Sequence, residues 1–262
     1  MNSFTFGQYI PGQSFVHSLD PRTKLYLVVV AMVAVLGVNT LLGVLITAFL
    51  TGTFILAARV PVRVYWSGTR PLLIVVVITA AFQIFFVPGE VIYRWWFITI
   101  SDVGVQMAAL MTYRLLMVIV LAQLLTFTTS PLQLTDGLER ILKPFSKIGI
   151  PAHELAMIMT IALRFIPVFF EEGNKITRAQ ISRGADFRGG WLRSARNLVS
   201  IIVPLFVRAF RRADELALAM EARCYTGGEG RTRLHVMVMS PADYGVITVT
   251  TIVVLFVIVS GL

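Results

Sequence analysis

Residues 25–58 read LYLVVVAMVAVLGVNTLLGVLITAFLTGTFILAA, a stretch without a charged side chain. As one helix it would be about 50 Å long, whereas the hydrocarbon core of a bilayer is about 30 Å thick. The residues GVNT at 37–40 are the only interruption of the apolar run. The stretch therefore predicts two membrane-spanning helices, at about 25–37 and 40–58, joined at this interruption.

The composition of the whole chain indicates the same environment. The 262 residues are 56% hydrophobic and 14% charged, with a mean hydropathy of +0.79. Soluble domains carry about 25% charged residues, so the expected surroundings are the lipid bilayer. The net charge of +9 is expected to hold loops in the cytoplasm, and no nucleic-acid partner is expected. One cysteine and three scattered histidines predict neither a disulfide nor a metal site.

Further apolar runs complete the membrane pattern. Asp20 and Pro21 predict the start of the first helix, because Asp is favoured as an N-cap and Pro at the first helical position. The aromatic segment 88–102 is expected at the outer interface, as a small hairpin. The remaining spans are predicted at 71–87, 103–127 and 243–262. The expected fold class is an all-α integral membrane protein with five transmembrane helices and long amphipathic cytoplasmic helices that cross.

Basic residues are distributed unevenly among the loops. Residues 131–242 hold 16 of the 23 Lys and Arg and 10 of the 14 Asp and Glu. Because basic loops stay in the cytoplasm, their alternation with loops poor in Lys and Arg predicts a multi-pass protein of the cell membrane. Its N-terminus is expected inside and its C-terminus outside. The basic segments are Arg22 with Lys24, 59–70 and 131–242, and the poor ones are 37–40, 88–102 and the C-terminus.

The same pattern divides the chain into three parts. Residues 1–129 form an N-terminal membrane part with four spans, 130–242 form a cytoplasmic and interfacial region, and 243–262 form the fifth span. Two apolar segments inside the middle part, 154–170 and 198–210, contain arginine and proline and are expected to lie along the cytoplasmic face.

The middle part carries one arginine-bearing helix end twice. The first copy, QISRGADFRGG, covers 180–190, and the second, AMEARCYTGG, covers 219–228. A basic residue followed by glycine is typical of a helix C-terminus. Capping does not require arginine or repetition, however, and a planar guanidinium suits a carboxylate in a partner's groove. Two copies therefore favour two grooves of one kind on a paired partner.

A ladder of small residues lies on the second of these helices. Ala209, Ala213 and Ala217 recur every fourth residue, a spacing that lets another helix approach closely. We therefore expect the two long helices to cross near these alanines.

These motifs give the chain a family resemblance. It resembles the transmembrane T component of energy-coupling factor (ECF) transporters, a family marked by two Ala-Arg-Gly motifs at the ends of coupling helices. The segments LDPRTKL at 19–25 and SPLQLTDGLERILKPFSKIGIP at 130–151 also look like this family. Here the motifs read Ser182-Arg183-Gly184 and Ala222-Arg223-Cys224. Because cysteine replaces glycine in the second, we expect that helix to continue towards Gly227.

The resemblance implies a role as a non-catalytic coupling subunit. Residues 182–184 and 222–224 would each bind one of two ABC-type ATPase subunits, which themselves bind ATP. The coupling helices would pass ATP-driven motion to a separate membrane-embedded S component, which binds the vitamin or metal ion. The chain itself is expected to bind no cofactor and to have no catalytic or metal-ligating residue.

Other function classes lack a pattern of their own. The sequence has no GxxxxGK[ST] phosphate-binding loop and no HExxH zinc motif. A channel or secondary carrier is the first alternative, but the apolar runs of the five predicted spans contain no Asp or Glu, and Arg114 is their only charge. A membrane-bound enzyme with a site in 131–242 is the second alternative. Its candidate residues are Asp136, Glu139, His153 and Glu154.

Overall fold

The computed structural model describes residues 9–95, 98–144, 151–185, 190–227 and 238–261. The described chain is almost entirely helical, which confirms the predicted all-α membrane class. It separates into two compact units, Met1–Gly137 with Val236–Leu262 and Leu138–His235. Each unit is described by itself below.

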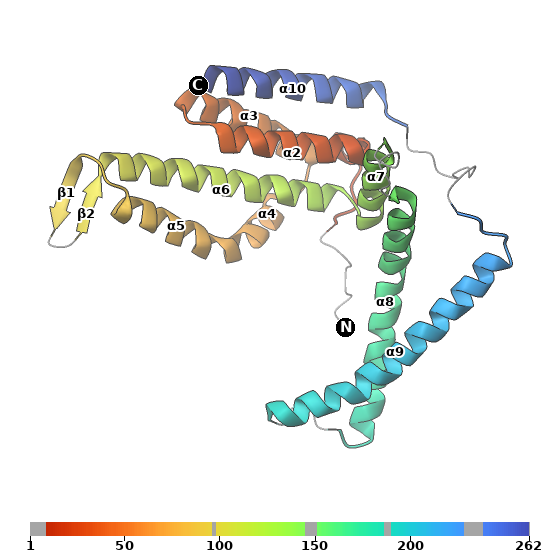
Figure 1. Ribbon diagram of the computed structural model, residues 1–262. Coiled ribbons are helices and arrows are strands. Elements are labelled where there is room, and N and C mark those ends of the chain that lie inside the picture. The colour runs from red at the N-terminus through yellow and green to blue at the C-terminus, as the bar shows by residue number, and fades with distance from the viewer. Residues whose placement is uncertain (1–8, 96–97, 145–150, 186–189, 228–237, 262) are drawn as a thin grey trace. The chain divides into compact units, whose positions relative to one another are not determined.

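The first unit is a group of helices that run side by side (Figure 1). Its central helix is α6, which packs against both α2 and α5, while α10 lies along α2. The elements are α1 (Phe15–Ser18), α2 (Pro21–Gly37), α3 (Leu41–Ala58), α4 (Val62–Thr69), the 3₁₀ turn η1 (Arg70–Leu72), α5 (Leu73–Phe86), β1 (Val91–Trp95), β2 (Ile98–Ser101), α6 (Asp102–Thr128), the start of α7 (Pro131–Leu142) and α10 (Pro241–Gly261).

Local sequence signals account for the boundary between α2 and α3. Asp20 caps α2 by accepting a hydrogen bond from the N–H of Arg22 at 2.9 Å, and Pro21 occupies the first turn. The chain leaves the helical conformation at Val38, and Thr40 caps α3 through the N–H of Gly43 at 3.3 Å. The interruption at 37–40 is thus the break between two helices.

The core of this unit lies between α6 and the helices around it. Leu121 of α6 is fully buried against Val28, Ala31 and Val35 of α2. At the C-terminal end of α6, Phe127 meets the ring of Tyr65 edge-on, with ring centroids 5.3 Å apart. The apolar residues facing away from this core remain exposed, as expected of side chains that contact lipid or partner helices.

A close approach of α5 and α6 occurs where β2 ends. A Cβ on Gly104 would lie 2.9 Å from the carbonyl oxygen of Gln83, so only glycine fits this contact without a shift. Ser101 fixes the same corner, since its hydroxyl donates to the carbonyl of Val87 at 2.8 Å and accepts from the N–H of Gly104 at 3.0 Å. The predicted hairpin at 88–102 appears as the antiparallel pair β1 and β2.

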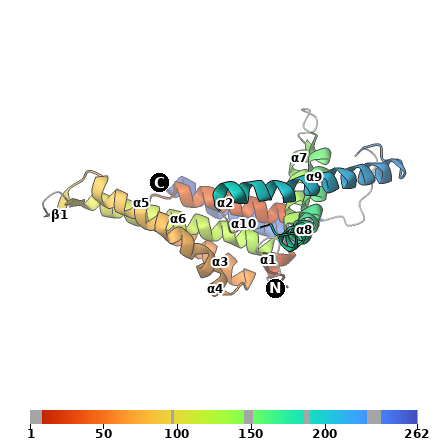
Figure 2. The same cartoon turned by 90° about the horizontal axis from the view of Figure 1, so that it is seen from below.

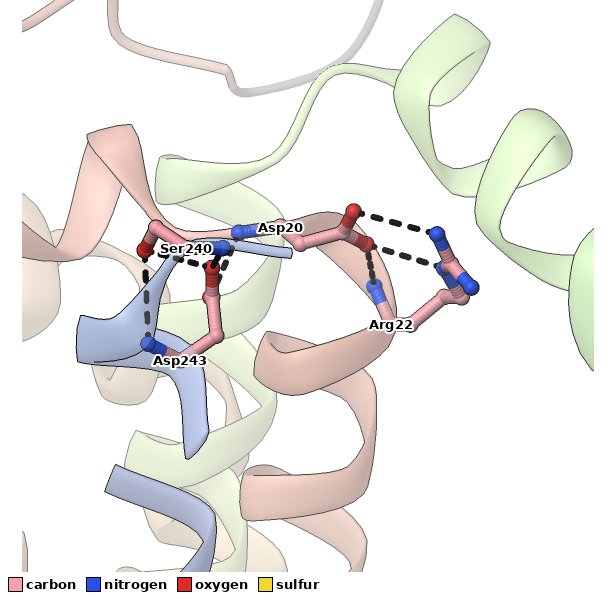
Figure 3. Close-up of polar contacts among 4 residues, drawn as sticks. All are labelled: Asp20, Arg22, Ser240 and Asp243. Atoms are coloured by element: carbon pink, nitrogen blue, oxygen red, sulfur yellow. Dashed lines mark hydrogen bonds and ion pairs between the residues drawn. The ribbon is translucent and has the colours of Figure 1, made fainter. Parts of the chain in front are cut away.

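A buried polar contact joins the beginnings of α2 and α10 (Figure 3). The Asp243 side chain, only 1% exposed, accepts a hydrogen bond from the backbone N–H of Asp20 at 2.9 Å. It also accepts from the N–H and the hydroxyl of Ser240, each at 2.8 Å, which forms a capping box at the start of α10. One carboxylate therefore both caps α10 and holds it against α2.

Five helical segments are long and apolar enough to cross a membrane. Four of them overlap predicted spans, in Leu41–Ala58, Val62–Phe86, Asp102–Thr128 and Pro241–Val259, and the second also includes residues 62–70, which were expected in a loop. The fifth is His153–Ser182, whereas α2 is not among them, because it has only 17 residues. The segment 154–170, expected along the membrane face, thus belongs to a helix with the length and hydropathy of a span.

The second unit consists of the end of α7 and two long helices that cross, α8 (Ala152–Ser182) and α9 (Trp191–Glu221). Figure 2 shows α8 nearly along its axis, with α9 passing across it. The described side chains of α9, from Leu198 onwards, are all at least partly exposed, including Phe206 and Phe210. Both helices contain a proline, Pro167 in α8 and Pro204 in α9.

Candidate functional site

The first arginine tip, Ser182–Gly184, ends α8. Gly184 has a φ of 89°, in the left-handed region. The N–H of Gly184 donates to the carbonyl of Ile181 at 2.9 Å, and the N–H of Ala185 donates to the carbonyl of Gln180, also at 2.9 Å. These two bonds form a Schellman motif, which satisfies the last carbonyl groups of the helix with backbone donors.

The second arginine tip, Ala222–Cys224, ends α9 in the same way. The N–H of Cys224 donates to the carbonyl of Glu221 at 2.8 Å, and the N–H of Tyr225 donates to that of Met220 at 3.0 Å. Cys224 adopts a φ of 54°. The expectation that this helix continues towards Gly227 is therefore wrong, because the two backbone bonds hold cysteine in the left-handed conformation that glycine would adopt without strain.

The two tips place their arginines at equivalent positions, one residue before the left-handed residue. Both arginines are exposed, and neither has an ion-pair partner among the described residues. Backbone N–H groups cap both helix ends, and in the described part of the chain no hydrogen bond from either guanidinium to these carbonyls is seen. Both guanidinium groups also lie favourably at the negative end of a helix dipole. Each tip thus presents a planar cationic donor that can bind a carboxylate.

A substitution pair tests the left-handed conformation at the two tips. We expect Cys224→Gly to stabilise the end of α9 by up to about 1 kcal/mol and Gly184→Ala to destabilise the end of α8 by about 1–2 kcal/mol, because a left-handed conformation strains any residue with a Cβ. Hydrogen exchange of the Tyr225 and Ala185 amides in detergent measures both effects. The control, Cys224→Ala, keeps the Cβ and should leave exchange at Tyr225 unchanged. Equal exchange in the glycine and alanine variants would contradict the expectation.

Charged and aromatic side chains meet where α8 and α9 cross. Arg208 of α9 pairs with Glu172 of α8, and the guanidinium of Arg212 lies over the ring of Phe165, 5.8 Å from its centroid. A crevice of about 200 Å³ opens beside the pair. The sequence analysis missed these residues, although the charged second half of each helix was the available signal.

The alanine ladder has a different position from the one expected for it. Ala209 is half-buried, while Ala213 and Ala217 are exposed. The contacts near the middle of the two helices come from Arg208, Arg212 and their neighbours. The role of the three alanines in a close helix contact therefore stays a prediction, and their exposed face is open to a partner.

Three other candidate residues, Arg114, His153 and Glu139, have local partners. Arg114 donates to the carbonyl of Val38 at 2.6 Å and to the side-chain oxygen of Asn39 at 3.0 Å, so it binds the C-terminal end of α2. His153 contacts Glu139, with 3.2 Å between the ring nitrogen and the carboxylate. Among the described residues, no three His, Cys, Asp or Glu side chains gather in a way that could hold a metal ion.

Comparison with known proteins gives a consistent set of matches. A family model described as cobalt transport protein, CbiQ, matches residues 12–236. A protein of Acidaminococcus fermentans is 49% identical over 93% of this chain and 91% of its own length. A protein of Clostridium kluyveri is 49% identical over 93% and 92%, and one of Ruminiclostridium cellulolyticum is 43% identical over 98% and 97%. All three are named energy-coupling factor transporter transmembrane protein EcfT.

Proposed function

The chain belongs to the EcfT and CbiQ family of transporter transmembrane proteins, and from this premise we propose that it couples two ATPase subunits to a substrate-binding subunit. Its first arginine tip binds one ABC-type ATPase and its second arginine tip binds the other. ATP-driven movement of the ATPases then reaches a membrane-embedded S component through α8 and α9. The chain itself supplies no catalytic group and binds no cofactor.

The observation that carries this proposal is the repeated geometry of the two tips. Arg183 and Arg223 project from two identical backbone caps that do not use their side chains. Two guanidinium groups presented in the same way fit two equivalent grooves, and a pair of similar ATPase subunits has two such grooves. A helix that needed only a C-terminal cap would be satisfied by the backbone bonds already present.

In this proposal, substrate recognition belongs to another chain. The S component binds a micronutrient, either a vitamin or a metal ion, and this chain transmits force rather than recognising the cargo. The alternatives were a channel or secondary carrier and a membrane-bound enzyme. A pathway would need exposed polar groups in the spans. Arg114, the charge within the apolar runs of the predicted spans, is engaged by Val38 and Asn39.

Co-purification tests the proposal against these alternatives. The tagged chain is expressed in its native host, extracted in mild detergent and captured, and the retained proteins are identified by mass spectrometry. We expect two ATPase polypeptides, or two copies of one, and a small hydrophobic S component. A channel or an enzyme would be captured without ATPases, and that result would overturn the proposal.

Cysteine labelling tests the proposed orientation, with the N-terminus inside and the C-terminus outside. In a Cys224→Ser background, cysteine is introduced singly at Thr40, Ser67 and Asp102, and intact cells are treated with a membrane-impermeant maleimide. Positions 40 and 102 should react from outside, whereas position 67 should react only after lysis, because basic loops remain in the cytoplasm. The reverse pattern would indicate that α8 crosses the membrane in place of α2.

A further inference from the structure

The two arginine tips lie far along their helices from the ion pair of Glu172 with Arg208. Eleven helical residues separate Glu172 from Arg183, and fifteen separate Arg208 from Arg223, which correspond to about 17 Å and about 23 Å at 1.5 Å per residue. A rotation of about 10° at the crossing therefore moves each tip by about 3–4 Å. A hydrogen-bonded ion pair does not tolerate such a displacement, so the crossing angle determines whether both arginines reach their grooves together.

Three levels of contact hold this crossing in an antiparallel register. The central level is the ion pair of Glu172 with Arg208, whose side chains are 22% and 60% exposed. Beside it, Arg212 lies over Phe165. The pair borders the open crevice, so water and salt reach it and its strength is that of a partly exposed pair. Such a pair adds little to the free energy of folding, but it favours one crossing geometry of α8 and α9.

The other two levels lie next to the arginine tips themselves. The Gln180 side-chain amide, three residues before Arg183, donates to the carbonyl of Ser200 at 3.4 Å. Pro204 lacks the N–H that would normally bond to this carbonyl, so the proline in α9 frees an acceptor for α8. The Tyr225 hydroxyl lies 3.1 Å from the sulfur of Met157 in α8. Each tip is thus braced by the first half of the opposite helix.

We propose that Glu172, Arg208, Gln180 and Tyr225 are positioning residues that set the separation and direction of Arg183 and Arg223. Their contacts fix one crossing geometry, in which both guanidinium groups face two ATPase grooves at the same time. The inference rests on the proposed function for its consequence in transport. The geometric part concerns the chain alone and is measured without any partner.

A charge exchange across the crossing tests the consequence. Glu172→Arg and Arg208→Glu should each lower ATPase retention by about two- to fivefold, because like charges then face each other across the crossing. The double variant E172R/R208E restores an opposite pair and should regain most of the loss. The matched control is Glu171→Arg, which makes the same charge change one residue earlier, where no ion pair is recorded among the described residues. Failure of the exchange to rescue, with both single losses present, would overturn the proposal.

A distance measurement on the full chain tests the geometry. In a Cys224→Ser background, spin labels are placed at Ser182→Cys and Ala222→Cys, and their distance distribution is recorded in lipid nanodiscs. We expect a narrow distribution in the parent, a broader or shifted one in Glu172→Arg and in Gln180→Met with Tyr225→Phe, and recovery in the charge-exchanged double variant. Unchanged distributions in all variants would overturn the positioning role. Loss of ATPase binding in Arg183→Glu with unchanged distances would leave the proposed function standing, so the two failures are distinguishable.

Discussion

Reversing the charge of both arginine tips, Arg183→Glu with Arg223→Glu, is expected to abolish ATPase retention while the protein still inserts into the membrane. Removing one partner of a desolvated charge pair typically costs about 2–5 kcal/mol, partly because the other charge is left unpaired. Arg183→Glu or Arg223→Glu alone should therefore weaken ATPase binding by about 30-fold or more, and the double variant should bind the ATPases more weakly than either single variant. Pull-down of the ATPases measures retention, and the level of the variant in membranes measures insertion.

Two further variants test whether ATPase retention depends on the position of the charge and on the shape of the cationic group. Arg178→Glu makes the same charge change at an exposed position of α8, five residues before Arg183, and should retain the ATPases. Arg183→Lys keeps the charge but loses the planar fork, so it should show an intermediate loss. If both charge reversals insert normally and hold the ATPases at parent strength, the arginine tips are helix ends without a docking role.

Replacing Asp243 by alanine is expected to give the largest loss of stability, about 2–4 kcal/mol. The substitution removes the capping acceptor of Ser240 and leaves the backbone N–H of Asp20 buried without its partner (Figure 3). Thermal unfolding in detergent, followed by tryptophan fluorescence, measures the change. Asp243→Asn retains one acceptor oxygen and should cost clearly less.

The consequence for transport distinguishes this contact from the arginine tips. Because Asp243 and Asp20 lie in the first unit, Asp243→Ala should lower the amount of folded protein without changing the ATPase retained per folded molecule. A normal melting temperature for Asp243→Ala would show that the bond between α2 and α10 contributes little. The opposite result, normal stability with lost ATPase binding, would assign Asp243 to the docking surface.

The apolar pattern alone was sufficient for the fold class and for most helices. The long apolar segments 40–58 and 103–127 favour helix in a bilayer, because every backbone group must be satisfied within the segment. Asp20, Pro21 and Thr40 mark helix starts through interactions that reach only two or three residues along the chain. The positions of the two arginine tips could also be predicted, because each motif, and the family resemblance that it carries, consists of consecutive residues.

Interactions between distant segments were readable only from the tertiary structure. Lys24 looks like a basic loop residue, yet it is 3% exposed and donates to the carbonyls of His17 and Thr128. Cys224 is a separate case: the sequence predicted a longer helix, but local backbone bonds at the end of α9 hold this residue in the left-handed conformation. The sequence determined where helices begin, because capping and hydropathy act over neighbouring residues. Only the tertiary structure decided that Glu172 meets Arg208 and that Asp243 meets Asp20, because the register of two packed helices depends on every side chain between them.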